Sequence, residues 1–255
     1  MEKGFPICPD HAIFLADAHL NQDDIHSRNF LALAERAAED GIPLFLLGDI
    51  FDLWFGTPGL TFAFQKPVIY RLRELRREGL RMYYVEGNRD FYLKEDHEGT
   101  TFDVVSEGDM QAAVGEKRLY LSHGDAVNRA DFSYRFFKGI SKSRLANQGV
   151  AHLPPSLFLP LADRLERKLR RSNRRHKGTF PEKDSREFAM RMFRNGVNFV
   201  ILGHFHQERL MRYSLDDATK VLAVLPSWKE RWRYFYVKAD GGYGFRMYRP
   251  GEPLL

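Results

Sequence analysis

The stretch Leu44-Phe45-Leu46-Leu47-Gly48-Asp49 contains the pattern that decides the fold: an apolar run, then a glycine, then a carboxylate. The apolar run over residues 12–16 likewise leads into Asp17, and the run over 81–85 leads into Gly87-Asn88. A short apolar run bounded by turn residues is typical of a buried strand, and glycine permits a tight turn after it. We therefore predict buried strands that each end in a polar turn.

Amphipathic stretches lie between the apolar runs. Their periodicity predicts three helices, each followed by a glycine, over residues 27–40, 62–78 and 184–195. Ser27 is the expected N-cap of the first helix. Further strands are predicted over 119–122 and 199–202, and antiparallel strands are predicted in the last third, over 221–225, 234–239 and 243–248. Alternating strands and helices indicate an α/β protein.

The region from about residue 126 to 182 has no strand signals. Leucines recur there with a spacing of four, at Leu157, Leu161, Leu165 and Leu169, which predicts an amphipathic helix. Residues 164–177 hold eight Lys or Arg and one acid, Glu166, so its other face is strongly basic. We expect a helical cap inserted into a single domain that comprises residues 1–255.

Composition limits the class of protein. With 255 residues, 44% of them hydrophobic and 29% charged, the chain resembles ordinary globular proteins rather than disordered ones. The single cysteine, Cys8, excludes an intramolecular disulfide and a cysteine-based zinc site. No apolar run approaches the ~20 residues that span a bilayer, and residues 1–10 lack the apolar stretch of a secretory signal. A cytoplasmic protein is expected, and its net charge of +5 weakly favours an anionic partner.

Five polar groups directly follow the predicted strands, and one alone would be explained by a turn or a helix cap. Strands of an open α/β sheet bring such groups to a common edge, and Asp17 and His19 are alternate residues at a strand end, so both can face one ion. Carboxylate, imidazole and amide ligands suit Mn²⁺, Fe²⁺, Zn²⁺ or Co²⁺, and seven are too many for one tetrahedral ion. The groups are Asp17-Ala18-His19, Gly48-Asp49-Ile50-Phe51-Asp52, Gly87-Asn88-Arg89-Asp90, His123-Gly124-Asp125 and Gly203-His204-Phe205-His206.

These five groups, in this order, resemble the signature blocks of the calcineurin-like metallophosphoesterases. The resemblance spans residues 17–206 and implies a four-layer α/β/β/α fold with two divalent metal ions, which we expect to be Mn²⁺. It implies that Asp52 binds no ion itself but orients or supports the residues that do. By position, one ion would be held by Asp17, His19, Asp49 and His206, and the other by Asp49, Asn88, His123 and His204.

The sequence Gly87-Asn88-Arg89-Asp90-Phe91 is similar to the third block of the UDP-2,3-diacylglucosamine pyrophosphohydrolases of lipid A biosynthesis. That resemblance implies attack of water on the α-phosphorus, which releases UMP and 2,3-diacylglucosamine 1-phosphate. Asn88, Arg89 and His204 would take part in catalysis, with Arg89 binding the diphosphate and Asp90 supporting the site. Substrate contacts are expected at Asn88 and Arg89 and, from the cap, at Asp131, Tyr134, Arg171, Asn173 and Lys183.

Other interpretations remain open for Arg89, for the cap and for the activity. Arg89 could be a surface arginine paired with Asp90, and the cap leucines could simply pack on the main domain instead of lining an acyl-chain groove. The protein could be a broader phosphodiesterase that acts on nucleotides or nucleic acid, or a non-catalytic scaffold of the same fold.

We favour a lipidated UDP-sugar as the substrate and a peripheral contact with the cytoplasmic face of the inner membrane. Nucleic acid is disfavoured because residues 164–177 contain no Phe, Tyr or Trp for base stacking, and no obligate protein partner is implied.

Overall fold

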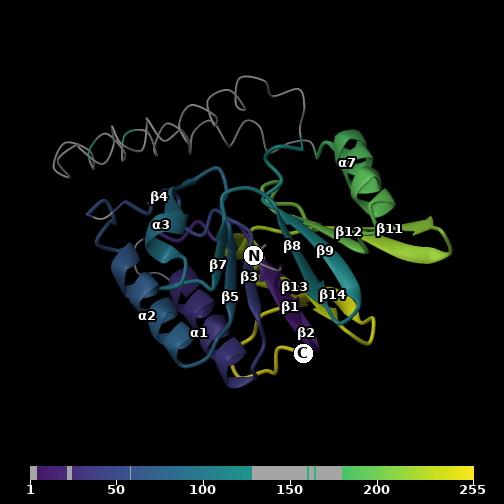
Figure 1. Cartoon of the computed structure of the whole chain (residues 1–255). Coiled ribbons are helices and arrows are strands. Elements are labelled where there is room, and N and C mark those ends of the chain that lie inside the picture. The colour runs from purple at the N-terminus through teal and green to yellow at the C-terminus, as the bar shows by residue number, and fades with distance from the viewer. Residues whose placement is uncertain (1–4, 22–24, 58, 128–159, 161–163, 165–179) are drawn as a thin grey trace.

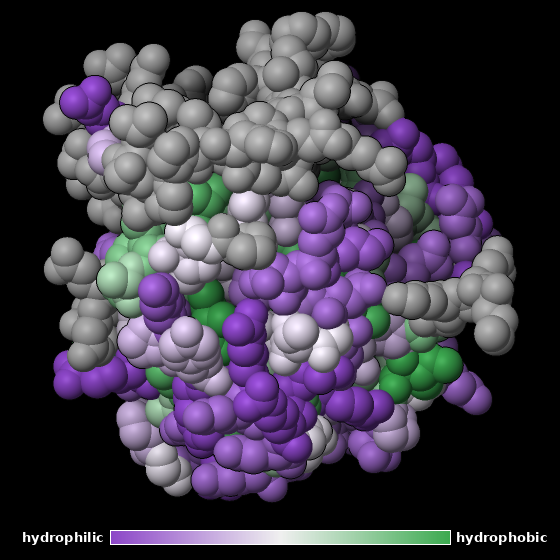
Figure 2. All heavy atoms as spheres, turned by 60° about the vertical axis from the view of Figure 1, so that its left-hand side comes forward, coloured by the Kyte–Doolittle hydropathy of each residue, from purple (hydrophilic) through white to green (hydrophobic). Residues whose placement is uncertain are grey.

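The computed structural model describes residues 5–21, 25–57, 59–127, 160, 164 and 180–255 (Figure 1). Nearly all of the predicted cap over residues 126–182 therefore lies outside the described residues. Among the residues that are described, no helix is both long and apolar enough to cross a bilayer. The face over the helices α1 (Ile25–Glu39), α2 (Gln65–Arg77) and α3 (Leu93–His97) is mainly hydrophilic, with apolar atoms in small scattered patches (Figure 2).

Two six-stranded sheets form the centre of the structure (Figure 1). The first has four parallel strands and an antiparallel pair at one edge. Its order is β14-β13-β2-β3-β5-β7. Its strands are β2 (His11–Leu15), β3 (Leu44–Leu46), β5 (Met82–Val85), β7 (Val104–Ser106), β13 (Arg233–Lys238) and β14 (Tyr243–Met247).

The second sheet has the order β1-β8-β9-β10-β12-β11. In it β9, β10 and β12 run parallel to one another, whereas β11 is antiparallel to β12. Its strands are β1 (Ile7–Cys8), β8 (Met110–Val114), β9 (Lys117–Ser122), β10 (Phe199–Leu202), β11 (Arg209–Leu215) and β12 (Ala218–Val224). A separate short ribbon pairs β4 (Trp54–Phe55) with β6 (Asp90–Phe91).

Helices cover the outer faces of both sheets (Figure 1). On the first sheet lie α1 (Ile25–Glu39), α2 (Gln65–Arg77) and α3 (Leu93–His97), and α7 (Glu182–Arg194) lies on the second. A short helix, α8 (Trp228–Arg231), follows β12.

Three apolar cores separate the resulting four layers. Alternate residues of a strand point to opposite faces, so Ile13 packs toward the helices whereas Phe14 packs between the sheets. In β10, likewise, Ile201 faces the other sheet and Val200 faces α7. This arrangement confirms the predicted α/β/β/α sandwich.

Several details differ from the sequence-based expectation. Ser27 is not an N-cap, because it lies inside α1 and its Oγ donates to the carbonyl of Asn21. The second helix begins at Gln65 rather than residue 62, since the Gln65 side chain accepts from the Phe62 amide and ends the preceding loop. The predicted strand over 221–225 pairs antiparallel with β11 but parallel with β10.

Candidate metal centre

The turns after five parallel strands meet at one edge of the sandwich. β2, β3 and β5 of the first sheet lead to Asp17 with His19, to Asp49 and to Asn88, and β9 and β10 of the second lead to His123 and to His204 with His206. Every one of these seven side chains makes a polar contact with another of them. The structure therefore brings together all of the predicted metal ligands.

Asp17, His19 and His206 form the first half of the site. The Nε2 atoms of the two histidines lie 3.1 Å apart. Both nitrogens face Asp17 Oδ1, at 3.8 Å from His19 and 3.2 Å from His206. Three atoms able to bind a metal thus surround a single point.

Asp49, Asn88, His123 and His204 form the second half. Asn88 Oδ1 lies 2.8 Å from His123 Nε2 and 3.1 Å from His204 Nδ1. His123 Nε2 is also 3.6 Å from Asp49 Oδ2, and Asp17, Asp49 and His123 make a second group with metal-ligand spacing. Asp17 belongs to both groups, so the two halves are continuous.

The donor atoms fit divalent ions. Asp17 Oδ1 and His19 Nδ1 are buried, and among the described residues they have only ion-pair contacts, with His206 and Asp52 respectively, and no hydrogen bond of good geometry. Buried polar atoms normally make a hydrogen bond, and a bound ion is a common explanation for an exception. Carboxylate, imidazole and amide ligands without thiolate match Mn²⁺ and similar cations.

Opposing charges act on the ionisation of these residues. Burial by itself would raise the pKa of Asp17, but His206, His123 and His19 together lower it below its ordinary value. Burial opposes a charge on His123, yet Asp49 and Asp17 raise the pKa of its ring. Burial, and then His123, lowers the pKa of His204 to about 4. The carboxylates thus attract positive charge to the centre of the site.

Left-handed backbone, rather than strand alternation, aims the ligands. We expected Asp17 and His19 to share a face because they alternate along a strand, but β2 ends at Leu15 and both residues have positive φ, 53° and 45°. His204 and His206 also have positive φ, at 71° and 55°. A residue with a Cβ adopts this region only when its surroundings impose it, so the tight turns themselves place the side chains.

Close packing of two loops explains the glycines at Gly48 and Gly87. Gly48 has φ of +83°, and a Cβ on it would lie 2.5 Å from the Gly87 amide nitrogen. A Cβ on Gly87 would overlap the Oδ1 atom of Asp49. Only glycine lets the backbones after β3 and β5 approach so closely.

Asp90 fastens these two loops to each other. Its Oδ2 accepts from the amides of Asp49 at 2.9 Å and Gly87 at 2.7 Å, and from the hydroxyl of Tyr84 at 2.9 Å. The sequence predicted a supporting role for Asp90 but gave no signal for Tyr84, which is one aromatic residue within an apolar strand. Asp52 lies beside His19, with 3.4 Å between its Oδ1 and His19 Nδ1.

Arg89 is buried next to the site, with 2% of its surface exposed. Its Nη1 donates to the carbonyl of Asp52 at 3.4 Å, and its amide donates to Asp49 Oδ1 at 2.8 Å. Its Nε has no hydrogen-bond partner within the described part of the chain. The alternative of a surface arginine is therefore wrong: next to Asn88 in the sequence is a buried guanidinium whose Nε makes no hydrogen bond within the described residues.

The expected cap contacts are only partly within the described structure. Lys183 lies exposed in the first turn of α7 and lines a shallow surface pocket with other residues of that helix, none of them among the seven. The remaining four, Asp131, Tyr134, Arg171 and Asn173, lie outside the described residues.

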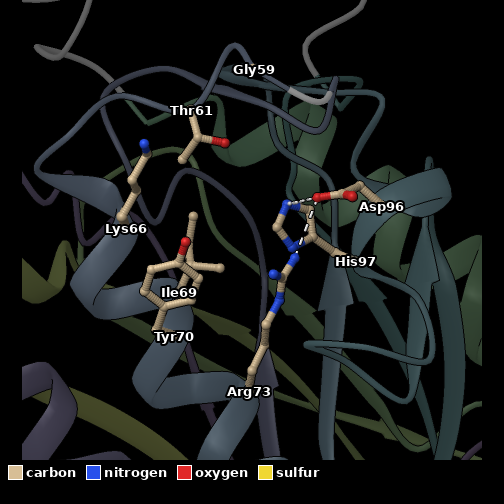
Figure 3. Close-up of a pocket in the computed structure, with 8 residues that line it drawn as sticks. All are labelled: Gly59, Thr61, Lys66, Ile69, Tyr70, Arg73, Asp96 and His97. Carbon is tan, nitrogen blue, oxygen red and sulfur yellow. Dashed lines mark hydrogen bonds and ion pairs between the residues drawn. The ribbon is translucent and has the colours of Figure 1, made fainter.

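A separate pocket of about 260 Å³ lies between α2 and α3 (Figure 3). Two of its lining side chains lie close to Asp96, whose Oδ2 is 3.3 Å from Arg73 Nη2 and 3.5 Å from His97 Nε2. His97 is 1% exposed, and its Nδ1 lies 2.9 Å from the Thr101 hydroxyl. Burial lowers its pKa to about 3. This histidine belongs to the packing of the helices.

Two packed sheets with these seven side chains at their strand ends are typical of one class of protein. Comparison with known protein families identifies the same class. The family model of the calcineurin-like phosphoesterases matches residues 11–208. The chain belongs to this family.

Curated relatives indicate which members of this family the chain is similar to. The UDP-2,3-diacylglucosamine hydrolase of Chromohalobacter salexigens is 30% identical over 219 residues, which cover 85% of this chain and 88% of that protein. The enzyme of the same name from Edwardsiella ictaluri is 28% identical over 231 residues, 90% of this chain and 89% of its own. A third, from Pseudomonas putida, is 29% identical over 224 residues, 86% of this chain and 91% of its own.

Proposed function

We propose that this protein is a metal-dependent hydrolase that cleaves the diphosphate of UDP-2,3-diacylglucosamine. Water attacks the α-phosphorus, and the products are UMP and 2,3-diacylglucosamine 1-phosphate. The observation that carries the proposal is the convergence of seven side chains able to bind a metal, beside a buried arginine. The names of relatives that match most of the chain support the choice of substrate.

Two divalent ions, most suitably Mn²⁺, would be held by the seven side chains. One would be bound by Asp17, His19 and His206 and the other by Asn88, His123 and His204, with Asp49 shared between them. Asp17 belongs to both groups of residues with metal-ligand spacing, so it would lie, like Asp49, between the two ions. When bound, such ions lower the pKa of water and neutralise phosphoryl oxygens.

The chain itself supplies orientation and charge. Arg89 offers a fixed, permanently charged donor set to the diphosphate, and burial strengthens that interaction. Asn88 presents its amide between His123 and His204 and so can contact both the ion and the substrate. Where His204 is not fully committed as a ligand, it would assist proton transfer to the leaving group.

Recognition of the lipid would come from the cap. Asp131, Tyr134, Arg171, Asn173 and Lys183 are the proposed contacts, and the apolar residues of the same insertion would receive the acyl chains. Basic residues over 164–177 would then face anionic headgroups, and they support our proposal of a peripheral contact with the cytoplasmic surface of the inner membrane.

A substrate comparison tests this proposal. The protein loaded with Mn²⁺ is offered UDP-2,3-diacylglucosamine, bis-p-nitrophenyl phosphate and single-stranded DNA, and the nucleotide product is identified by mass spectrometry. We expect UMP and a strong preference for the lipid. Release of UDP, or turnover of DNA or the small ester that equals turnover of the lipid, would overturn the assignment in favour of a broader phosphodiesterase.

A further inference from the structure

A sixth strand end also reaches the metal centre, although its residues lie beyond the part matched by the family model, which ends at residue 208. β12 ends at Val224, and the segment that follows it pairs with the turn after β2. Ser227 Oγ donates to the carbonyl of Asp17 at 2.8 Å, and the Trp228 amide donates to the carbonyl of Ala16 at 3.3 Å. Ser227 is 2% exposed, so water cannot readily replace this bond.

The contacted turn is the one that carries Asp17 and His19 in left-handed conformation. On one side, the amides of Asp17 and His19 donate to the carbonyls of Gly48 and Asp49, at 3.1 and 3.0 Å. On the other side, their carbonyls accept from Ser227 Oγ and, at 3.4 Å, from Lys229 Nζ. The strained turn is therefore held at its amides by the loop after β3 and at its carbonyls by the segment after β12.

The segment that provides these donors is itself firmly anchored. Trp228 is fully buried and packs edge-on against Phe30 of α1, with 6.3 Å between the ring centroids. Trp232 Nε1 donates to His26 Nδ1 at 3.1 Å. Two indoles thus fix the segment to the start of α1, and Ser227 has a rigid base from which to hold the turn.

We propose that Ser227 is a positioning residue for metal binding. By fixing the Asp17 carbonyl, it keeps the Asp17 carboxylate and the His19 imidazole aimed at the point they share with His206. This inference rests on the proposal that the seven side chains bind two divalent ions. Residues that orient ligands commonly affect metal affinity about 10–100-fold when they are removed.

Titration of Mn²⁺ into the metal-free protein by calorimetry tests the role. Ser227→Ala should weaken one of the two Mn²⁺ ions about 10-fold or more and leave the other unchanged, and Ser227→Thr, which keeps the hydroxyl, should restore most of the affinity. Ser185→Ala is the matched control, because Ser185 is fully buried in α7 but its Oγ has no hydrogen-bond partner among the described residues. That variant should bind both ions as the wild type does.

The outcomes separate this inference from the proposed function. Wild-type affinity at both ions in a folded Ser227→Ala variant would overturn the positioning role, as would an equal loss at both ions. If Ser227→Ala fails to fold, Lys229→Met takes its place and should weaken the same single ion. A wild-type protein that binds two Mn²⁺ without cleaving the lipid substrate would refute the proposed reaction but leave the role of Ser227 standing.

Discussion

Asp90 shows how one buried carboxylate can fix two ligand-bearing loops. Asp90→Ala would leave the amides of Asp49 and Gly87 and the Tyr84 hydroxyl without this acceptor. Buried donors left without a partner cost about 1–3 kcal/mol each, so we expect a loss of about 3 kcal/mol in the free energy of unfolding. Urea denaturation measures it, with Asp90→Asn as a control that retains an acceptor oxygen and should lose less. A loss below about 0.5 kcal/mol would contradict this role.

Arg89 should act on turnover rather than on metal binding. It touches the loop of Asp52 and adjoins Asn88, but it contains no metal-ligand atom. Arg89→Ala should lower kcat about 100-fold, the scale seen when one charge-stabilising donor is removed, while metal analysis still finds two ions. Arg77→Ala, at an exposed position of α2, is the control. Loss of both ions from the Arg89 variant would refute the assigned role.

Residue types, more than residue positions, made the site predictable. Asp17, His19, Asn88 and the other predicted ligands are carboxylate, imidazole and amide side chains, which are seldom found together at successive strand ends for structural reasons alone. Tyr84 and Ser227 could not be found in this way, because a tyrosine in a strand and a serine in a turn are common everywhere. Their roles depend on which backbone groups the fold places opposite them.

At the scale of the elements, the turn after β5 depends on a glycine. Gly87→Ala would drive a Cβ into the Asp49 carboxylate, so the loop must shift and Mn²⁺ affinity should fall at least 10-fold. Gly108→Ala is the matched control, since a Cβ there meets nothing within 4 Å. Calorimetric titration of both variants checks the prediction, and unchanged affinity in Gly87→Ala would contradict the close packing of these turns.

The packing of α3 predicts a pH dependence of stability. Because burial holds the pKa of His97 near 3 against an ordinary 6.5, the unfolded chain binds a proton in that window that the folded chain does not. The part of the free energy of unfolding that depends on His97 staying uncharged is fully present above pH 6.5 and is lost as the pH falls toward 3. His97→Gln should therefore reduce the loss of unfolding free energy between pH 7 and pH 5 by about 2 kcal/mol.

Urea denaturation at the two pH values gives this difference directly. His11→Gln is the control, because His11 is half-buried at the start of β2 and lies outside this packing. An identical pH dependence in the wild type and the His97 variant would show that His97 does not carry the effect.

Strong hydrophobic periodicity made some elements predictable and its absence hid others. The apolar runs of β2, β3, β5 and β10 are buried on both faces, so they stand out in the sequence. β11 is not predicted by the sequence, because its residues are only partly buried or exposed and so do not form a continuous apolar run. Ser27 was misassigned since an N-cap is defined by backbone geometry, and here the helix begins before it.

At the scale of the whole molecule, the four layers follow from strands with two apolar faces. Such strands need cover on both sides, and the three cores supply it. The sequence could not reveal which strands adjoin, because the pairing of β13 with β2 joins residues more than two hundred positions apart.

The central claim is that these seven side chains bind two divalent ions. A crystal of the protein grown with Mn²⁺ and measured for anomalous scattering tests it most directly. We expect two peaks about 3.5–4 Å apart, within bonding distance of Asp17, His19, Asp49, Asn88, His123, His204 and His206. A single peak, or peaks bound elsewhere on the protein, would contradict the account.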